Sequence, residues 1–473
     1  MVFSSSLFLL YFFPIFLIVY FLLPNKLRNI FILLASIAFY AWGAPRFVFI
    51  VLLSLAADFY LVKWMYSCKG KKRKLLVSLS VLLNIGMLAW FKYANFGVEN
   101  LNNLLGALGF SEISWTAIVL PIGISFFSFQ KVTYSVDVYR SVHRPLQRLT
   151  DYAMYILMFP QLIAGPIVRF NEIADQIEDR KKMETIDNRL TGFFRFVIGL
   201  SKKVLIANVL GEQADRIFGL EQPDLTTPLA WIGILAYAFQ IYFDFSGYSD
   251  MAIGIGRMIG FKFPENFNNP YISQSITEFW RRWHMTLGRF MKDYLYIPLG
   301  GNRVSTSRMY FNLWLVFALS GLWHGAAWTF VVWGIFHGFF LILDRLFLLR
   351  FYKTIGKIPA VFITFIITLV GWVFFRSETL PDAFFYIGKM FSFDFRETSI
   401  FFDRQFYSIL ILAFGFSFFA LVKSIEPWQD RVLAVEQKNK TILVMFIFSV
   451  VFFVIGLASI TSSGFNPFIY FRF

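Results

Sequence analysis

Residues 441–460 read TILVMFIFSVVFFVIGLASI, a run of twenty residues without a charged side chain. An α-helix of about 20 apolar residues is long enough to cross the hydrocarbon core of a bilayer. Backbone N–H and C=O groups in lipid must be satisfied within the segment, so such a run predicts a membrane-spanning helix rather than an open strand. This one stretch therefore predicts an integral membrane protein.

The rest of the chain repeats this pattern. Hydrophobic residues make up 58% of the sequence and charged residues only 15%, against about 25% charged in a soluble domain. The predicted fold class is an all-α, polytopic transmembrane helical protein, taken as a single domain over residues 1–473. The apolar runs lie near residues 3–23, 29–42, 46–62, 75–91, 115–136, 191–219, 228–244, 309–322, 325–343, 358–375, 404–422 and 441–460.

Loop charge orients these runs. The net charge of +15 comes from Lys and Arg between apolar runs, as the positive-inside rule expects, which argues against a nucleic-acid partner. Both termini are then predicted to be extracytoplasmic, in a multi-pass protein of the bacterial cytoplasmic (inner) membrane. The stretches predicted to lie inside are 63–74, 140–203, 257–308, 345–357 and 423–440. The stretches predicted to lie outside are 92–114, which has Lys92 as its only base, 220–227, which has none, and 376–403.

Two stretches are not predicted to be simple spans. Phe159–Pro166 contains two prolines and a glycine in an apolar run, which indicates a re-entrant element packed in protein or lining a cavity. Residues 274–297 are amphipathic and rich in Trp and Arg, typical of a helix lying at the membrane interface. Cys68 is the only cysteine and no His-Glu-x-x-His pair occurs, so no metal site is predicted. A Walker A loop and a Gly-x-Ser-x-Gly elbow are also absent from the sequence, so no competing catalytic motif is found.

Candidate chemistry rests on few histidines. His324 lies in Ser320–Trp328, at the turn of the hairpin formed by 309–322 and 325–343. A histidine inside a membrane hairpin is a functional candidate because its burial without a role is costly, and a neutral imidazole can act as a general base. A satisfied structural histidine is the alternative. For His337, within the run 325–343, packing and function are equally open.

His284 lies in Ile276–Leu287, where an interfacial helix with an aromatic belt is the simpler interpretation. Arg282 in the same stretch can face headgroups or an anionic substrate. Tyr242–Asp250 concentrates polar residues in an apolar setting. There Asp244 and Asp250 could bind a cation or orient a partner, and capping of the next helix is the plainer interpretation.

The sequence resembles the membrane-bound O-acyltransferase (MBOAT) superfamily. The resemblance is carried by Phe243–Asp250, Ile276–Gly301 and Leu322–Trp328, with further support from Phe127–Lys131 and Phe159–Arg169. It is greatest to a bacterial branch that contains the membrane subunits for alginate and peptidoglycan O-acetylation and for teichoic acid D-alanylation. The resemblance implies about 10–12 membrane helices around a thinned centre. It also implies a core catalytic region over 243–343.

The resemblance implies catalytic roles for His324, at the Trp-His-Gly element, and for His284, at an upstream position. Phe468–Phe473 resembles a terminal aromatic motif of this branch, within residues 461–473, whose tyrosine here is Tyr470. That tyrosine is thought to carry the acyl group as an ester to an extracellular transferase; an interfacial aromatic anchor is the alternative. Predicted substrate contacts are Trp323, Arg282, Trp283 and Asp244.

The implied activity is O-acetylation of an extracytoplasmic polysaccharide, with acetyl-CoA as the acyl donor and no permanently bound cofactor. The implied partners are the lipid bilayer, the polysaccharide acceptor and a separate extracytoplasmic transferase, an SGNH-type acetyltransferase or a similar accessory protein. Direct acylation of a lipid or glycan is the alternative within the superfamily. A non-enzymatic transporter or channel for the acyl donor, or a scaffold for polymer export, are alternatives of other classes.

Overall fold

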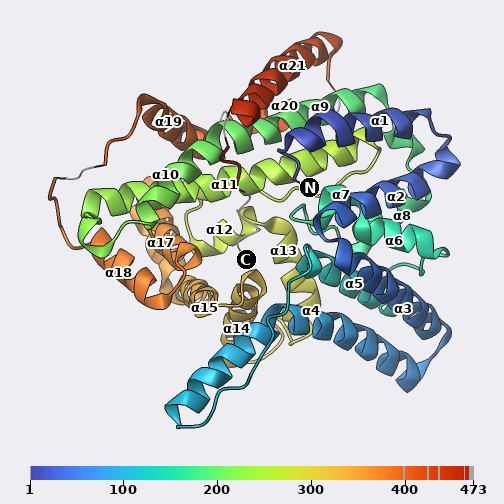
Figure 1. Cartoon of the computed structure of the whole chain (residues 1–473), viewed down its shortest axis with the longest axis horizontal. Helices are drawn as coiled ribbons and strands as arrows, with labels where there is room; N and C mark the ends of the chain where they lie inside the picture. Colours follow the sequence, from blue (N-terminus) through green and yellow to red (C-terminus); the bar gives the residue numbers. More distant parts are fainter. Residues whose placement is uncertain (1, 398–399, 423–424, 435–436, 463, 468–473) are drawn as a thin grey trace. The chain divides into compact units, whose positions relative to one another are not determined.

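The computed structural model describes residues 2–397, 400–422, 425–434, 437–462 and 464–467 (Figure 1). Over these residues the secondary structure is helical and contains no strand. This confirms the predicted all-α polytopic class. Within the described ranges, seven helical segments are long and apolar enough to span a membrane: Pro45–Ser67, Gly70–Ala107, Thr227–Met258, Trp328–Ile355, Lys357–Arg376, Arg404–Leu421 and Asn439–Ser462.

The chain divides into two compact units, Met1–Met183 with Gly260–Pro264, and Glu184–Ile259 with Glu265–Phe473. In the first unit α2 packs on α6, and α4 packs on both α3 and α5. Its helices, with η for short 3-10 or π segments, are η1 (Phe8–Phe12), α1 (Phe13–Leu22), α2 (Asn25–Gly43), η2 (Pro45–Phe47), α3 (Val48–Ser67), α4 (Gly70–Ala107), α5 (Ile124–Tyr139), α6 (Leu149–Leu157), α7 (Phe159–Leu162), α8 (Phe170–Glu178) and η3 (Lys181–Met183).

Helix α4 continues well beyond the predicted run 75–91. Its last turns carry Asn95 and Asn102, whose side-chain amides pair with the backbone of the returning segment at Ile118 and Ile113. These amides supply the partners that the returning backbone requires without a second helix. The predicted run 115–136 is therefore helical only from Ile124.

In the second unit α9 packs on α11 and on α21, and α14 packs on α15. Its helices are α9 (Ile186–Ser201), η4 (Lys202–Ala207), α10 (Asn208–Phe218), η5 (Gln222–Asp224), α11 (Thr227–Met258), η6 (Pro270–Ile272), α12 (Ile276–Arg282), α13 (Met285–Phe290), η7 (Met291–Tyr296), α14 (Thr306–His324), α15 (Trp328–Leu343), η8 (Asp344–Leu348), α16 (Leu349–Ile355), α17 (Lys357–Arg376), α18 (Leu380–Met390), α19 (Arg404–Phe418), η9 (Phe419–Leu421), α20 (Glu426–Leu433) and α21 (Asn439–Ser462).

The predicted hairpin is formed by α14 and α15, which lie side by side in Figure 1. The two helices approach closely at Gly321. A Cβ atom at this position would lie 2.2 Å from the Phe330 carbonyl oxygen and 3.1 Å from Gly334 Cα. Small residues at such a crossing allow the backbones of membrane helices to approach. The crossing fixes the end of α14, where His324 is the last residue.

Two interpretations of the second unit were wrong. Asp250 does not cap a following helix, because α11 runs through the predicted end at 244 to Met258 and both Asp244 and Asp250 lie inside it. The stretch 274–297 is not one helix, because it breaks into α12, α13 and η7. The break falls at His284, whose φ of +45° is left-handed and cannot continue an α-helix.

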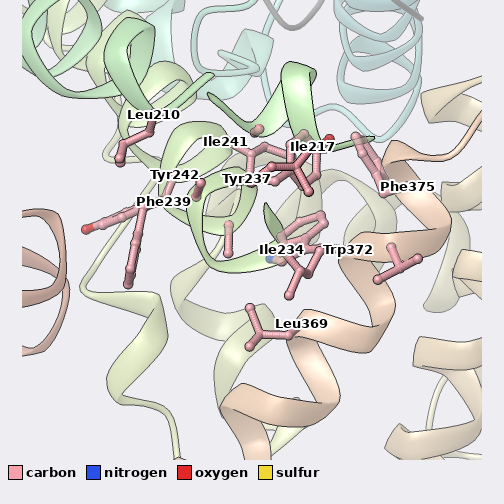
Figure 2. Close-up of a cluster of buried hydrophobic side chains, with 14 of the residues drawn as sticks. Leu210, Ile217, Ile234, Tyr237, Phe239, Ile241, Tyr242, Leu369, Trp372 and Phe375 are labelled. Carbon is pink, nitrogen blue, oxygen red and sulfur yellow. The ribbon is translucent and has the colours of Figure 1, made fainter. Parts of the chain in front are cut away.

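The hydrophobic core of the second unit lies between α10, α11 and α17. Figure 2 shows Leu210 and Ile217 from α10 and the row Ile234, Tyr237 and Ile241 of α11 beside Leu369, Trp372 and Phe375 of α17. Trp372 is 1% exposed and Leu369 is fully buried. The same α17 face reaches the candidate site, because Trp372 also contacts Trp283 and Phe375 contacts His324.

Candidate active site

Helix α12 begins at the N-cap residue Ser275. Ser275 Oγ accepts the backbone N–H of Glu278 at 3.1 Å, and the Glu278 carboxylate accepts the backbone N–H of Gln274 at 2.9 Å. The same turn is tied to η8, since Asp344 accepts both the N–H and the hydroxyl of Thr277 at 2.7 and 2.8 Å. These contacts satisfy the N–H groups of Thr277 and Glu278 in the first turn of a seven-residue helix that is too short to be stable alone. They fix the position from which the chain turns into His284.

His284 is held by the loop that precedes η6. Its Nδ1 lies 3.2 Å from Asn266 Oδ1, and the N–H of Met285 donates to the Asn266 carbonyl at 2.9 Å. The ring packs edge-on against Phe245 of α11, with centroids 4.7 Å apart. Burial, with 1% of the residue exposed, lowers the pKa of His284 from 6.5 to about 3. His284 therefore stays neutral near neutral pH.

His324 lies in an aromatic wall built by three helices. Its ring centroid is 4.9 Å from Trp323, 5.1 Å from Trp333 of α15 and 5.3 Å from Phe375 of α17. Only 6% of the residue is exposed. The wall restricts the imidazole to a narrow range of positions and limits the access of bulk water to it.

The structure brings His284 and His324 together, with ring centroids 6.2 Å apart and planes inclined by 64°. Trp323 lies beside both, 6.0 Å from His284. The two histidines come from segments forty residues apart and meet because the α12–α13 break and the end of α14 face each other. An imidazole such as that of His324, enclosed by aromatic rings and beside a neutral histidine, can accept a proton and pass it on.

The other predicted substrate contacts lie in different settings. Trp283 is 2% exposed and packs among Phe279, Trp372 and Phe267 with centroid separations of 5.6, 4.9 and 5.0 Å. The structure thus gives Trp283 a packing role, and a substrate contact stays a prediction. Arg282 pairs with Glu278 at 2.9 Å with 21% of its side chain exposed, so it retains some access to solvent.

Asp244 forms an ion pair with Lys203, the two charged atoms lying 2.9 Å apart. Both side chains are almost completely buried, and such a pair needs further hydrogen bonds to compensate its desolvation. Lys203 has one, because its ammonium also donates to the carbonyl of Pro467. Tyr470 and the rest of the aromatic motif from 468 lie outside the described residues.

A second ion network lies around Asp250, six residues further along α11. Arg195 of α9 contacts Asp250 at 2.6 Å and Glu265 at 2.7 Å, and Lys202 contacts the other oxygen of Asp250 at 2.7 Å. Lys202 and Lys203 are adjacent in the π segment η4, and π segments inside helices are frequent at functional sites. Between them they pair with both aspartates that the sequence singled out.

Sequence reasoning missed Asn266 and Lys203. Asn266 stands in Glu265–Pro270, where three asparagines occur in six residues of an apolar region, and that concentration of amides was an available signal. Lys203 was counted only as loop charge. His337, which sequence reasoning left open, is fully buried among Trp280, Trp333 and Phe336. Within the described residues, no three His, Cys, Asp or Glu side chains gather as metal ligands.

The fold and site define a helical membrane protein with a buried pair of histidines suited to acid–base chemistry. A model of the MBOAT, membrane-bound O-acyltransferase family matches residues 37–378. This range holds both histidines and covers well over half of the chain. The chain belongs to the MBOAT family and is an O-acyltransferase.

The curated relatives agree with this assignment. The probable alginate O-acetylase AlgI of Azotobacter vinelandii is 47% identical over 398 residues, 83% of this chain and 78% of that protein. The peptidoglycan O-acetyltransferase of Helicobacter pylori is 38% identical over 418 residues, covering 81% and 78%. The teichoic acid D-alanyltransferase of Bacillus subtilis is more distant, 31% identical over 229 residues, 46% of this chain and 56% of that protein.

Proposed function

We propose that this chain is the membrane subunit of a bacterial polysaccharide O-acetyltransferase. The observation that carries the proposal is the enclosed His284–His324 pair, at positions where the resemblance implies catalysis. Relatives named for alginate and peptidoglycan O-acetylation support an acetyl group and a polysaccharide acceptor. A separate extracytoplasmic transferase completes the reaction on the polymer.

In this proposal the acyl donor is acetyl-CoA, reaching the site from the cytoplasm. His324 removes the proton from the Tyr470 hydroxyl as its oxygen attacks the thioester carbonyl. A C–O bond forms, the C–S bond breaks, and the proton on His324 passes to the leaving thiolate, so that free CoA and an acetyl-tyrosine ester result. Such a general base contributes roughly 10² to 10⁴ in rate. An unassisted tyrosine, with a pKa near 10, is a poor nucleophile at neutral pH.

The contacts of the C-terminal tail support a tyrosine relay. Besides the Lys203 contact to Pro467, Asn208 Nδ2 donates to the Phe465 carbonyl at 3.3 Å and lies 3.4 Å from Asn466 Oδ1. The tail that leads to Tyr470 is thus held against η4 and the start of α10. Asp244, through its ion pair, fixes the ammonium that holds the tail.

The test is mass spectrometry of the C-terminal peptide after the purified full chain has been incubated with acetyl-CoA. We expect one base-labile acetyl group on Tyr470 in the wild type and none in His324→Ala or Tyr470→Phe. Consumption of acetyl-CoA with an unmodified Tyr470 would overturn the relay in favour of direct transfer. No consumption, even with a candidate partner transferase present, would overturn the donor and favour the transporter alternative.

The tail contacts are tested in the same assay with Lys203→Gln. This change removes the ammonium that bridges Asp244 and Pro467, so we expect less acetyl-Tyr470 per acetyl-CoA consumed. Lys389→Gln is the matched control, because Lys389 also pairs with an aspartate, Asp394 at 3.1 Å, and makes no contact to the described tail. Equal ester yields in the two variants would remove the tail contacts from the proposal.

A further inference from the structure

The orientation of the Asn266 side chain is fixed by its partners. The backbone N–H of Thr286 points at Oδ1 at 3.3 Å and the Thr286 hydroxyl lies 2.8 Å from the same atom, while Nδ2 lies 3.1 Å from Ser249 Oγ. A backbone N–H can only donate, so the atom that faces it must be the amide oxygen. The alternative, flipped amide would set two donors against each other.

This orientation decides the tautomer of His284. Asn266 Oδ1 is an acceptor, and His284 Nδ1 lies 3.2 Å from it, so Nδ1 must carry the hydrogen. A neutral imidazole with a proton on Nδ1 has a lone pair on Nε2. Asn266 also holds the backbone of the left-handed turn through its carbonyl, which accepts the Met285 N–H. One residue therefore fixes both the conformation and the protonation of His284.

The Nε2 atom of His284 is buried and has no hydrogen-bond partner among the described residues. A buried acceptor left in this state costs free energy, and native proteins rarely tolerate it without a use. The ring stands beside His324, 6.2 Å between centroids, and hydrogen bonds between catalytic groups are often long until substrate binds.

We propose that Asn266 is a positioning residue that locks His284 in the Nδ1–H tautomer, so that Nε2 accepts a hydrogen bond from the protonated His324 during acyl transfer. The arrangement follows the logic of a triad, in which a third group orients the base and stabilises its cation. No proton moves to His284. The proton taken from the acceptor hydroxyl stays on His324 until it passes to the thiolate, and Asn266 acts only through His284. This inference rests on His324 being the base of the proposed function.

Charged side chains near His284 and His324 have other partners. The rings that contact either histidine, Phe245, Trp323, Trp333 and Phe375, do not titrate. Several charged groups on the elements that pack here are engaged elsewhere: Asp250 and Glu265 with Arg195, Asp244 with Lys203, Arg282 with Glu278, and Arg289 with the Glu265 carbonyl.

The tautomer is measured by ¹⁵N NMR of the full chain in lipid nanodiscs with labelled histidine. The chain has only 4 histidines, so the signals are few, and His284→Gln assigns the one that matters. We expect a protonated Nδ1 and an unprotonated Nε2 from pH 5 to 8. Asn266→Ala should give a mixture of tautomers, and the matched control Asn268→Ala, on the exposed side of the same loop, should not. A wild-type His284 protonated on Nε2, or on both nitrogens, would overturn the proposal.

The second readout is the pKa of His324 in the same spectra, which requires no knowledge of the substrate. Losing the acceptor at Nε2 destabilises the His324 cation, so His284→Ala and Asn266→Ala should both lower the His324 pKa. His284→Gln, whose amide oxygen can reach the Nε2 position, should restore it. An unchanged His324 pKa in His284→Ala contradicts the proposal even if the protein is less stable, because a purely structural role predicts that result.

Activity separates this inference from the function on which it rests. With an active wild type, His284→Ala should lose about 10- to 100-fold in kcat, the effect of one hydrogen bond to a charged group. The acidic side of its pH–rate profile should move to lower pH, because the pKa of His324 is lower in this variant. His284→Gln should keep most of the activity. Failure of the wild type to consume acetyl-CoA while the tautomer and His324 pKa behave as expected would overturn the donor and leave the positioning role standing.

Discussion

Two buried polar clusters, one in each unit, are satisfied to different degrees. In the first unit Asp58 of α3 accepts hydrogen bonds from Ser80 at 2.6 Å, Asn84 at 2.9 Å and Tyr152 at 2.5 Å, so both of its carboxyl oxygens are used. In the second unit His284 uses one ring nitrogen on Asn266 and leaves the other open among the described residues.

This difference in hydrogen bonding separates a structural role from a functional role for a buried polar side chain. The Asp58 cluster ties α3 to α4 and α6, and both of its carboxyl oxygens accept from these helices, so its burial is explained by the helices that it holds together. At the histidine site, His284 Nε2 has no hydrogen-bond partner among the described residues and lies beside His324, which makes this site the functional candidate of the two. Buried polar groups in a membrane protein are functional candidates by default, and the saturation of their partners distinguishes the two cases.

The largest effect should come from the open site. His324→Ala should lower the rate of acetyl-CoA consumption by about 10² to 10⁴-fold, the range expected for loss of a general base. The melting temperature should change little, because the aromatic wall around residue 324 remains. The rate is measured on protein shown to be folded by thermal melting. If the variant has a lower melting temperature and a normal rate per folded molecule, His324 has a structural role like that of the Asp58 cluster.

The saturated cluster should behave in the opposite way. Asp58→Ala removes the carboxylate that accepts from Ser80, Asn84 and Tyr152. Ser80 and Asn84 keep a second partner, the Ser135 hydroxyl and the Ser80 carbonyl, so the main cost is the unsatisfied Tyr152 hydroxyl, at about 1–3 kcal/mol. We expect a clear drop in melting temperature and an unchanged kcat for the molecules that remain folded. Thermal melting in detergent and the acetyl-CoA assay decide this together. A lower kcat at unchanged stability would show that the first cluster also serves the reaction.

The α14–α15 hairpin that carries His324 should be sensitive to added side-chain volume at Gly321, where the two helices approach most closely. Gly321→Ala adds a Cβ atom that would lie 2.2 Å from the Phe330 carbonyl, and such overpacking typically costs about 1–3 kcal/mol. Gly388→Ala in α18 is the control, since a Cβ there meets nothing within 4 Å. We expect lower melting temperature and activity in the first variant only, and matching behaviour of the two would mean that the hairpin yields without cost.

The smallest effect should appear on acidification. The pKa of His284 is about 3 in the folded chain and near 6.5 when exposed, so below pH 6.5 the unfolded state binds a proton that the folded state does not. Stability is therefore lost as the pH falls from 6.5 toward 3, by up to about 1.4 kcal/mol per pH unit for this group. Melting temperatures at pH 7.5 and 5 should differ less in His284→Gln than in the wild type, and an equal difference would contradict the pKa.

Much of the fold could be predicted because the relevant signals are local. The absence of charge over 441–460 requires a helix in any membrane, and the structure has α21 over Asn439–Ser462. The hairpin of 309–322 and 325–343 appears as α14 and α15 for the same reason. Helix boundaries that depend on side chains from distant parts of the sequence were not predicted. Helix α11 runs on through Asp244 and Asp250 because lysines of η4 and Arg195 of α9 neutralise them.

The candidate site divides in the same way. The residue types and the likeness of three blocks to one family marked His284 and His324, whereas Tyr470 lies outside the described residues and stays a prediction. The sequence by itself determined a membrane protein of many helices, its family and its two candidate histidines, because hydrophobic length and ordered motifs are properties of the chain.

Only the tertiary structure decided how those histidines differ. Asn266 is eighteen residues from His284 and meets it because a left-handed turn ends α12 there. Hydrogen-bond direction, and with it the tautomer, depends on which groups from distant segments face each other, and no local pattern encodes that. The same holds for Lys203, which the sequence presents as one more loop charge and the fold places between Asp244 and the C-terminal tail.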